Sequence, residues 1–132
     1  MFGTLSGKRI AVFGFAFKAN TGDTRESPAQ GIVRDLLEER AEVVVSDPQA
    51  LDNARLDLGD VRERLRFEAD PYAAAAGADA IVLCTAWGVY RNLDWARIHR
   101  DMTQPSFVFD GRNHLDAAAL RELGFTVLCV GS

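Results

Sequence analysis

The sequence is poor in cysteine and histidine, and this excludes several kinds of protein. It has 2 cysteines, Cys84 and Cys129, among 132 residues, and each lies in an apolar run. We therefore expect buried, reduced thiols and no secreted disulfide framework. The 2 histidines, His99 and His114, have no other ligand-type residue at metal-ligand spacing. We expect surface or capping roles for them and no metal site.

Long apolar runs and an excess of positive charge are also missing. No stretch approaches the roughly 20 apolar residues that cross a bilayer, and residues 1–8 hold no apolar core long enough for a signal peptide. We therefore expect a cytoplasmic protein with no membrane partner. The formal net charge of −4 argues against a general nucleic-acid binder, which needs a basic face. A small anion site, which needs only a few local cations, is not excluded.

What is present is an ordinary globular composition, 48% hydrophobic and 26% charged, at a length that fits one domain spanning residues 1–132. Apolar runs predict strands at 9–15, 43–45, 66–68, 80–85, 106–109 and 125–130. Helices are expected at 28–40, 60–65, 70–76, 94–102 and 117–123, with Asp70 and Asp94 as N-caps and Gly124 as a stop. The alternation predicts an α/β fold, a Rossmann-like open parallel sheet with helices on both faces.

Ligands of such sheets bind outside the carboxyl ends of the strands, at a switch point in strand order. The first of these loops lacks the glycine-rich GxGxxG motif of a dinucleotide site, because Gly14 is followed by Ala16. Asp47, after the second strand, stands where a ribose-binding acid would be expected. Without the glycine loop we assign Asp47 to a turn or an N-cap.

The loop from Ala16 to Ser27 carries two cations, Lys18 and Arg25, among small polar residues. Lysine offers phosphate a mobile point charge and arginine a bidentate grip, and the amides that open the next helix add to an anion site. The alternative is a solvated loop in which Arg25 pairs with a neighbouring carboxylate. Composition alone does not separate the two.

The order of residues here resembles a known family. The pattern comprises residues 14–18 (GFAFK), 21–28 (TGDTRESP), 45–48 (VSDP), 70–72 (DPY), 83–87 (LCTAW), 93–98 (LDWARI) and 109–113 (FDGRN). These segments cover nearly the whole chain and resemble the C-terminal, UDP-binding domain of the UDP-glucose/GDP-mannose dehydrogenase family, in particular of UDP-glucose 6-dehydrogenases.

The resemblance implies part of an enzyme that oxidises UDP-glucose to UDP-glucuronate with two NAD+, as a homo-oligomer when full-length. It implies that Phe17 and Lys18 contact the substrate, that Arg112 holds a diphosphate or sugar oxygen, and that Arg25 reaches the NAD. Trp87 is a candidate for the wall of the nucleotide pocket.

The family's catalytic cysteine, glycine-rich NAD loop and middle helices are absent from this chain, so we expect no catalytic residue in it and no turnover by it alone. Two alternatives stay open. One is the same domain of a dehydrogenase for another nucleotide sugar, such as GDP-mannose or a UDP-N-acetylhexosamine. The other is a free-standing nucleotide-sugar-binding module. Asp110 either orients Arg112 or forms a turn, and Trp95 packs in the core or at a subunit contact.

Overall fold

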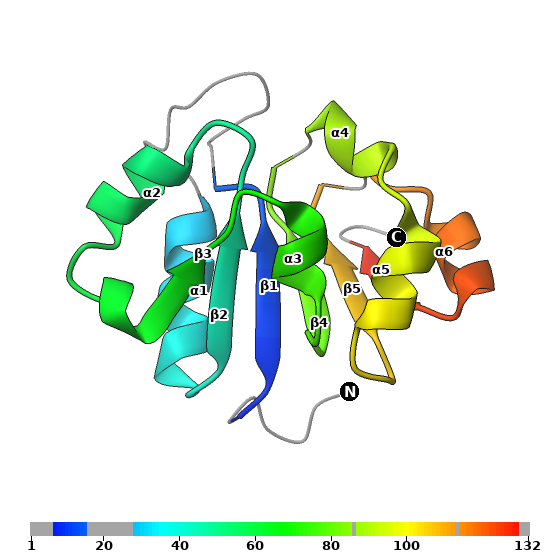
Figure 1. Cartoon of the computed structure of the whole chain (residues 1–132), viewed down its shortest axis with the longest axis horizontal. Helices are drawn as coiled ribbons and strands as arrows, with labels where there is room; N and C mark the ends of the chain where they lie inside the picture. The colour runs from blue at the N-terminus through cyan, green and yellow to red at the C-terminus, as the bar shows by residue number, and fades with distance from the viewer. Residues whose placement is uncertain (1–6, 16–27, 86, 113, 130–132) are drawn as a thin grey trace.

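The computed structural model describes residues 7–15, 28–85, 87–112 and 114–129, with only the backbone described at Pro28, Arg62 and Cys129. The described strands form one parallel sheet in the order β3-β2-β1-β4-β5-β6 (Figure 1). They are β1 (Arg9–Phe13), β2 (Glu42–Ser46), β3 (Leu65–Phe67), β4 (Ala80–Leu83), β5 (Phe107–Asp110) and β6 (Thr126–Cys129).

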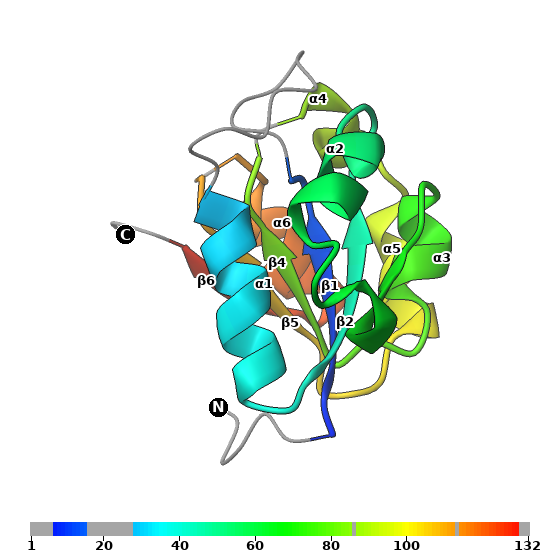
Figure 2. The same cartoon turned by 90° about the vertical axis from the view of Figure 1, so that its left-hand side faces the viewer.

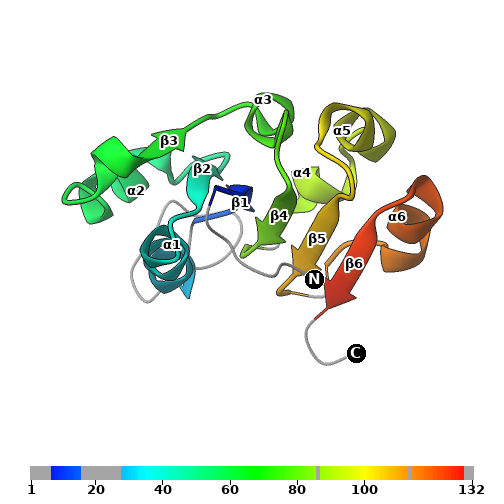
Figure 3. The same cartoon turned by 90° about the horizontal axis from the view of Figure 1, so that it is seen from below.

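Helices lie on both faces of this sheet, which confirms the predicted Rossmann-like architecture. They are α1 (Pro28–Glu38), α2 (Leu51–Asp57), the 3-10 turn η1 (Arg62–Arg64), α3 (Pro71–Ala75), α4 (Gly88–Arg91), α5 (Trp95–Asp101) and α6 (Ala117–Leu123). α1 lies on one face, while α3, α5 and α6 lie on the other (Figures 2 and 3). α2 lies beside α1, where Arg34 Nη2 donates to the Asp57 carbonyl at 3.1 Å.

The central strands are continuous apolar runs because both of their faces are covered. Residues 10–13 of β1 and 43–45 of β2 are buried throughout, as are three of the four residues of β4. Aromatic rings extend this core: Phe13 stacks on Tyr90 with ring centroids 5.3 Å apart. Trp95 is buried and packs edge-on against Phe125 at 5.9 Å, so of its two predicted places the structure shows the core.

Side-chain caps fix several helix ends where the sequence predicted them. Asp70 accepts from the Tyr72 amide at 2.9 Å, and Asp94 accepts from the Arg97 amide at 3.1 Å. Gly124 adopts φ 110°, the left-handed conformation that ends a helix. The sequence also predicts Ser27 as the N-cap of α1, but Ser27 lies outside the described residues.

The prediction for residues 49–68 is only partly right. The sequence pattern predicts a helix at 60–65. The structure has only the 3-10 turn η1 there, and the α-helix of this segment is α2, which precedes it. Buried Leu51, Ala54 and Leu58 recur at helical spacing, but α2 is short and has no side-chain cap at Ala50. The four-residue helix α4 was also missed. Among the described residues no helix is long and apolar enough to span a bilayer.

Candidate functional site

The strand order reverses between β1 and β4, so the expected switch point lies at their carboxyl ends, at the top of Figure 1. Backbone hydrogen bonds continue past the strands there. The Gly14 amide donates to the Ser46 carbonyl at 2.7 Å, and the Cys84 amide donates to the Phe13 carbonyl at 2.9 Å. The loops that follow β1, β2 and β4 therefore leave the sheet from a rigid edge.

A buried carboxylate, Asp47, joins these three loops. Its Oδ1 accepts from the amides of Gln49 at 2.8 Å and Ala50 at 2.7 Å. Its Oδ2 accepts from the Phe15 amide at 2.7 Å and from the Trp87 indole Nε1 at 3.1 Å. Four donors compensate the burial of one charge. The predicted turn role is confirmed, and the same side chain also anchors the residue before the 16–27 loop.

A second buried carboxylate, Asp110, organises the loop after β5. Its Oδ1 accepts from the Arg112 amide at 3.0 Å, and its Oδ2 accepts from the amides of His114 at 2.8 Å and Leu115 at 2.7 Å. Of its two predicted roles, Asp110 therefore forms a turn. His114 Nε2 lies 2.8 Å from the Trp87 carbonyl, and since a carbonyl only accepts, Nε2 carries the proton in this bond.

These contacts make one network across the carboxyl edge. Asp47 holds Trp87 through its indole, Trp87 holds His114 through its carbonyl, and His114 is held by Asp110. The network fixes the backbone of Arg112, whose side chain is exposed. An exposed guanidinium beside the switch point is well placed to meet an anion.

Cys84 lies at the end of β4 beneath this network, buried and free of any disulfide. Burial raises the pKa of its thiol to about 12, although the nearby Arg112 charge acts in the opposite direction. A thiol with such a pKa is protonated near neutrality and is not an activated nucleophile. The side chain of Cys129 lies outside the described residues.

Glycine is required at position 14. Its φ is 94°, and a Cβ built there would lie 2.6 Å from the Thr85 Cβ, far closer than two carbons can pack. The absence of a side chain lets the β1 and β4 loops approach each other at the switch point.

The structure places the sequence-predicted residues unequally. Of the four proposed ligand contacts, Arg112 alone is described; Phe17, Lys18 and Arg25 lie outside the described residues. Trp87 is buried with its indole N–H bonded to Asp47. The surface or capping role predicted for His99 is only partly right: the residue is half-buried, its ring packs edge-on against Phe125 at 4.9 Å, and its buried Nε2 has no hydrogen-bond partner among the described residues.

Sequence reasoning also missed the ties that Trp87 and His114 make between loops. The signal for the carboxylates was present, since Asp47 and Asp110 each end a strand and precede a residue suited to turns. Within the described part of the chain no cluster of three or more possible metal ligands exists.

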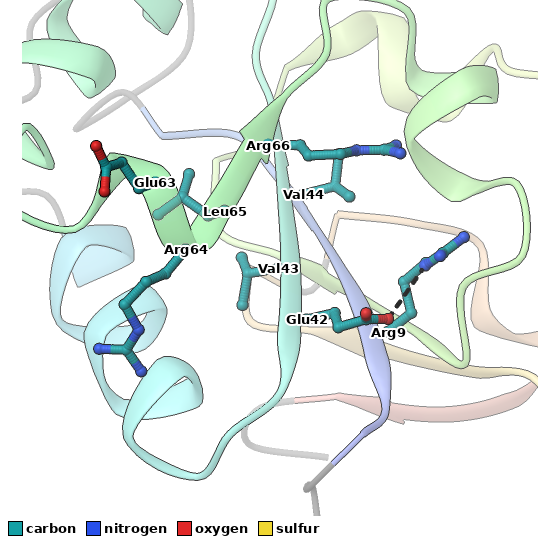
Figure 4. A pocket seen from close by; sticks show the side chains of 8 residues that line it. All are labelled: Arg9, Glu42, Val43, Val44, Glu63, Arg64, Leu65 and Arg66. Atoms are coloured by element: carbon teal, nitrogen blue, oxygen red, sulfur yellow. Dashed lines mark ion pairs between the residues drawn. The ribbon is translucent and has the colours of Figure 1, made fainter.

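A separate hollow of about 190 Å³ lies at the amino-terminal side of β1, β2 and β3, away from the switch point (Figure 4). Its charged lining includes Arg9, whose Nε lies 3.6 Å from Glu42 Oε2, and Arg64, which donates to the Leu37 carbonyl at 2.7 Å. Ligands of open parallel sheets bind at the other edge, so we do not place the site in this hollow.

Comparison with known proteins agrees with the resemblance. Residues 11–117 match the UDP-glucose/GDP-mannose dehydrogenase family, UDP binding domain. A UDP-glucose 6-dehydrogenase of Caenorhabditis elegans is 47% identical over 139 residues, which cover 100% of this chain and 29% of that protein. UDP-glucose 6-dehydrogenase 1 of Arabidopsis thaliana is 39% identical over 150 residues, covering 99% and 31%.

Solved structures give the same result. A UDP-glucose dehydrogenase from Pyrobaculum islandicum superposes with a TM-score of 0.74 at 34% identity, over 94% of this chain and 27% of that one. A UDP-D-ManNAc dehydrogenase from Pyrococcus horikoshii gives 0.76 at 29% identity, over 97% and 26%. The chain thus spans less than a third of these relatives. With a family match over most of its length, it belongs to the UDP-glucose/GDP-mannose dehydrogenase family, as a UDP binding domain.

Proposed function

We propose that this chain is the substrate-holding domain of an NAD-dependent UDP-glucose 6-dehydrogenase, which oxidises C6 of UDP-glucose to the carboxylate of UDP-glucuronate with two NAD+. The observation that carries the proposal is the hydrogen-bond network at the carboxyl ends of the strands, which we call the tied carboxyl edge. In it Asp47 holds the amide of Phe15, the residue before the 16–27 loop, and Asp110 holds the amide of Arg112. The 47% identity to a UDP-glucose 6-dehydrogenase supports the choice of sugar.

Each candidate residue has a distinct part in this proposal. Lys18 and Arg112 bind the diphosphate, Lys18 as a mobile charge and Arg112 as a planar fork. Phe17 packs against the uridine or the sugar. Arg25 extends toward the NAD of a neighbouring domain. The fixed backbone at Arg112 reduces the conformational entropy that this loop loses when substrate binds.

The chemical step belongs to the parts of the enzyme that this chain does not span. Cys84, with its raised pKa, does not serve as the nucleophile. Asp47 does not hold the ribose of NAD either, because each of its oxygens already accepts two N–H donors. We therefore expect the isolated domain to be inactive.

The binding test uses a chimera, in which this chain replaces the matched segment of the Caenorhabditis elegans relative. Titration calorimetry with UDP-glucose measures the affinity of the wild-type chimera and of the double variant Lys18→Ala with Arg112→Ala. One charge-assisted hydrogen bond contributes about 1.5–3 kcal/mol, so each lost cation weakens binding by roughly 10- to 100-fold. Arg100→Ala, an exposed arginine in the last turn of α5, is the control and retains wild-type affinity.

Wild-type affinity in the double variant would refute the assignment of the site. The same titration separates the alternatives. Tighter binding of a UDP-N-acetylhexosamine than of UDP-glucose favours a dehydrogenase like that of Pyrococcus horikoshii. Tighter binding of GDP-mannose than of UDP-glucose favours a GDP-mannose dehydrogenase. Equal affinity of the isolated chain and the chimera identifies a free-standing binding module.

A further inference from the structure

Half of one sheet face has no helix over it among the residues that the structure describes. In the order β3-β2-β1-β4-β5-β6 the chain winds first one way and then the other. Right-handed crossovers therefore place the helices of the two halves on opposite faces. Figure 3 shows this arrangement, with α1 on one side of the sheet and α3, α5 and α6 on the other. On the face that carries α1, no described helix lies over β5 and β6.

Most side chains of this region are apolar, and the exposed Thr126 of β6 is the exception. The strand register sets Val82, Phe109 and Leu128 side by side on β4, β5 and β6, and we call these three residues the bare face. Val82 and Phe109 are half-buried, while Leu128 is 47% exposed. On the opposite face, Val108 and Val127 are only 0% and 3% exposed. Parallel sheets are normally covered on both sides, but no helix of the described part of the chain covers the bare face.

We propose that the bare face is the docking surface for one amphipathic helix from the part of the dehydrogenase that this chain does not span. The inference rests on the proposed function, in which the chain works within a longer enzyme. The relatives are long enough to supply the helix, since this chain matches only 29% and 31% of two of them.

The dimensions of the bare face select a single helix. Neighbouring strands lie about 4.8 Å apart, so β4 to β6 span about 10 Å, which is the diameter of one helix with its side chains. Packed helices lie 8–10 Å apart, by the usual rule, so a helix on β4–β6 would lie in the same layer as α1 and beside it.

A second copy of this chain fits less well. Two sheets that pack face to face lie about 10 Å apart, and α1 stands on this same face and occupies that space (Figure 3). The helix of one copy would hold the other sheet away from Leu128. A helix that lies beside α1 meets no such obstacle.

Thiol labelling tests the proposal. Leu128→Cys is made in the isolated chain and in the Caenorhabditis elegans chimera, and its reaction with a maleimide is followed by peptide mass spectrometry. We expect the rate at residue 128 to be at least tenfold lower in the chimera. Leu56→Cys is the control, because Leu56 lies on α2, outside the bare face, and is 79% exposed. Its rate should be the same in both proteins.

Equal rates for Leu128→Cys in the isolated chain and the chimera would overturn the proposal. So would protection of the isolated chain that grows with its concentration, since a second copy would then be the occupant. The matched substitutions in the unmodified Caenorhabditis elegans protein give the same test if the chimera does not fold. Labelling needs no nucleotide sugar, so failure of the Lys18 and Arg112 assignment leaves this readout unchanged.

Discussion

Asp47→Asn is the sharpest test of the tied carboxyl edge. The carboxylate has two acceptor oxygens, and each receives two N–H donors in the native structure. An asparagine keeps one oxygen and places an amide NH2 where the other oxygen was. Whichever way the amide turns, two of the four donors lose their acceptor and face another donor.

The geometry sets the expected magnitude. Asparagine accepts well in the local turn, so its oxygen faces Gln49 and Ala50, and the pair left unsatisfied is the Phe15 amide and the Trp87 indole. Hydrogen bonds to a charged group contribute about 1.5–3 kcal/mol each. The loss of two in a buried site lowers the free energy of unfolding by about 3–5 kcal/mol. For a chain of this length that lowers Tm by roughly 10 °C or more.

Urea unfolding followed by circular dichroism and tryptophan fluorescence measures this change. Asp52→Asn, which alters an exposed carboxylate paired with Arg55, is the matched control and should change the free energy by less than about 0.5 kcal/mol. Trp87→Phe removes one donor, so its effect and that of Asp47→Asn should be non-additive by about 1 kcal/mol. A free energy of unfolding of Asp47→Asn within about 0.5 kcal/mol of the wild-type value, the usual range of surface substitutions, would refute this reasoning.

Two further predictions concern the residues around this edge. Gly14→Ala should destabilise the chain by more than about 2 kcal/mol in urea, because the added Cβ meets Thr85 and φ 94° is strained for alanine; Gly31→Ala, where a Cβ meets nothing within 4 Å, is the control and should not destabilise. The raised pKa of Cys84 means that the folded chain holds the thiol proton more tightly than the unfolded chain, in which the thiol has its ordinary pKa of 9.0. Stability should therefore fall as pH rises from 9 toward 12, with a slope up to about 1.4 kcal/mol per pH unit from this group. Cys84→Ala should reduce that slope, and an unchanged slope would contradict the assignment.

The sheet could be predicted because its signals are local. The strand run at residues 9–15 and the caps at Asp70 and Asp94 depend on neighbours in sequence, and each was found where expected. α2 was missed because its three buried apolar residues span only about two turns without a side-chain cap. The packing of the His99 ring could not be predicted, because it depends on Phe125, 26 positions away. No pattern within α5 indicates this contact.

The chemistry of the candidate site stays a prediction, and the contacts that support it could not be predicted from the sequence. The family resemblance implies Arg112 as a substrate contact, but the bonds that hold its loop join Asp47 to Trp87 and Trp87 to His114, across 40 and 27 positions. Contacts at such separation follow from strand order, because β1, β2, β4 and β5 bring their ends to one edge. The sequence predicts an open parallel sheet, but it does not predict the order of the strands.

The two buried carboxylates explain how a domain without a GxGxxG motif after its first strand builds a rigid edge at the proposed site. Each stands at the carboxyl end of a strand, and each uses both oxygens to collect amide donors that would otherwise be buried without partners. Because Pro48 has no N–H, the Asp47 carboxylate accepts from the amides of Gln49 and Ala50, which follow the proline. The two negative charges thus shape the edge beside which the Arg112 side chain is exposed.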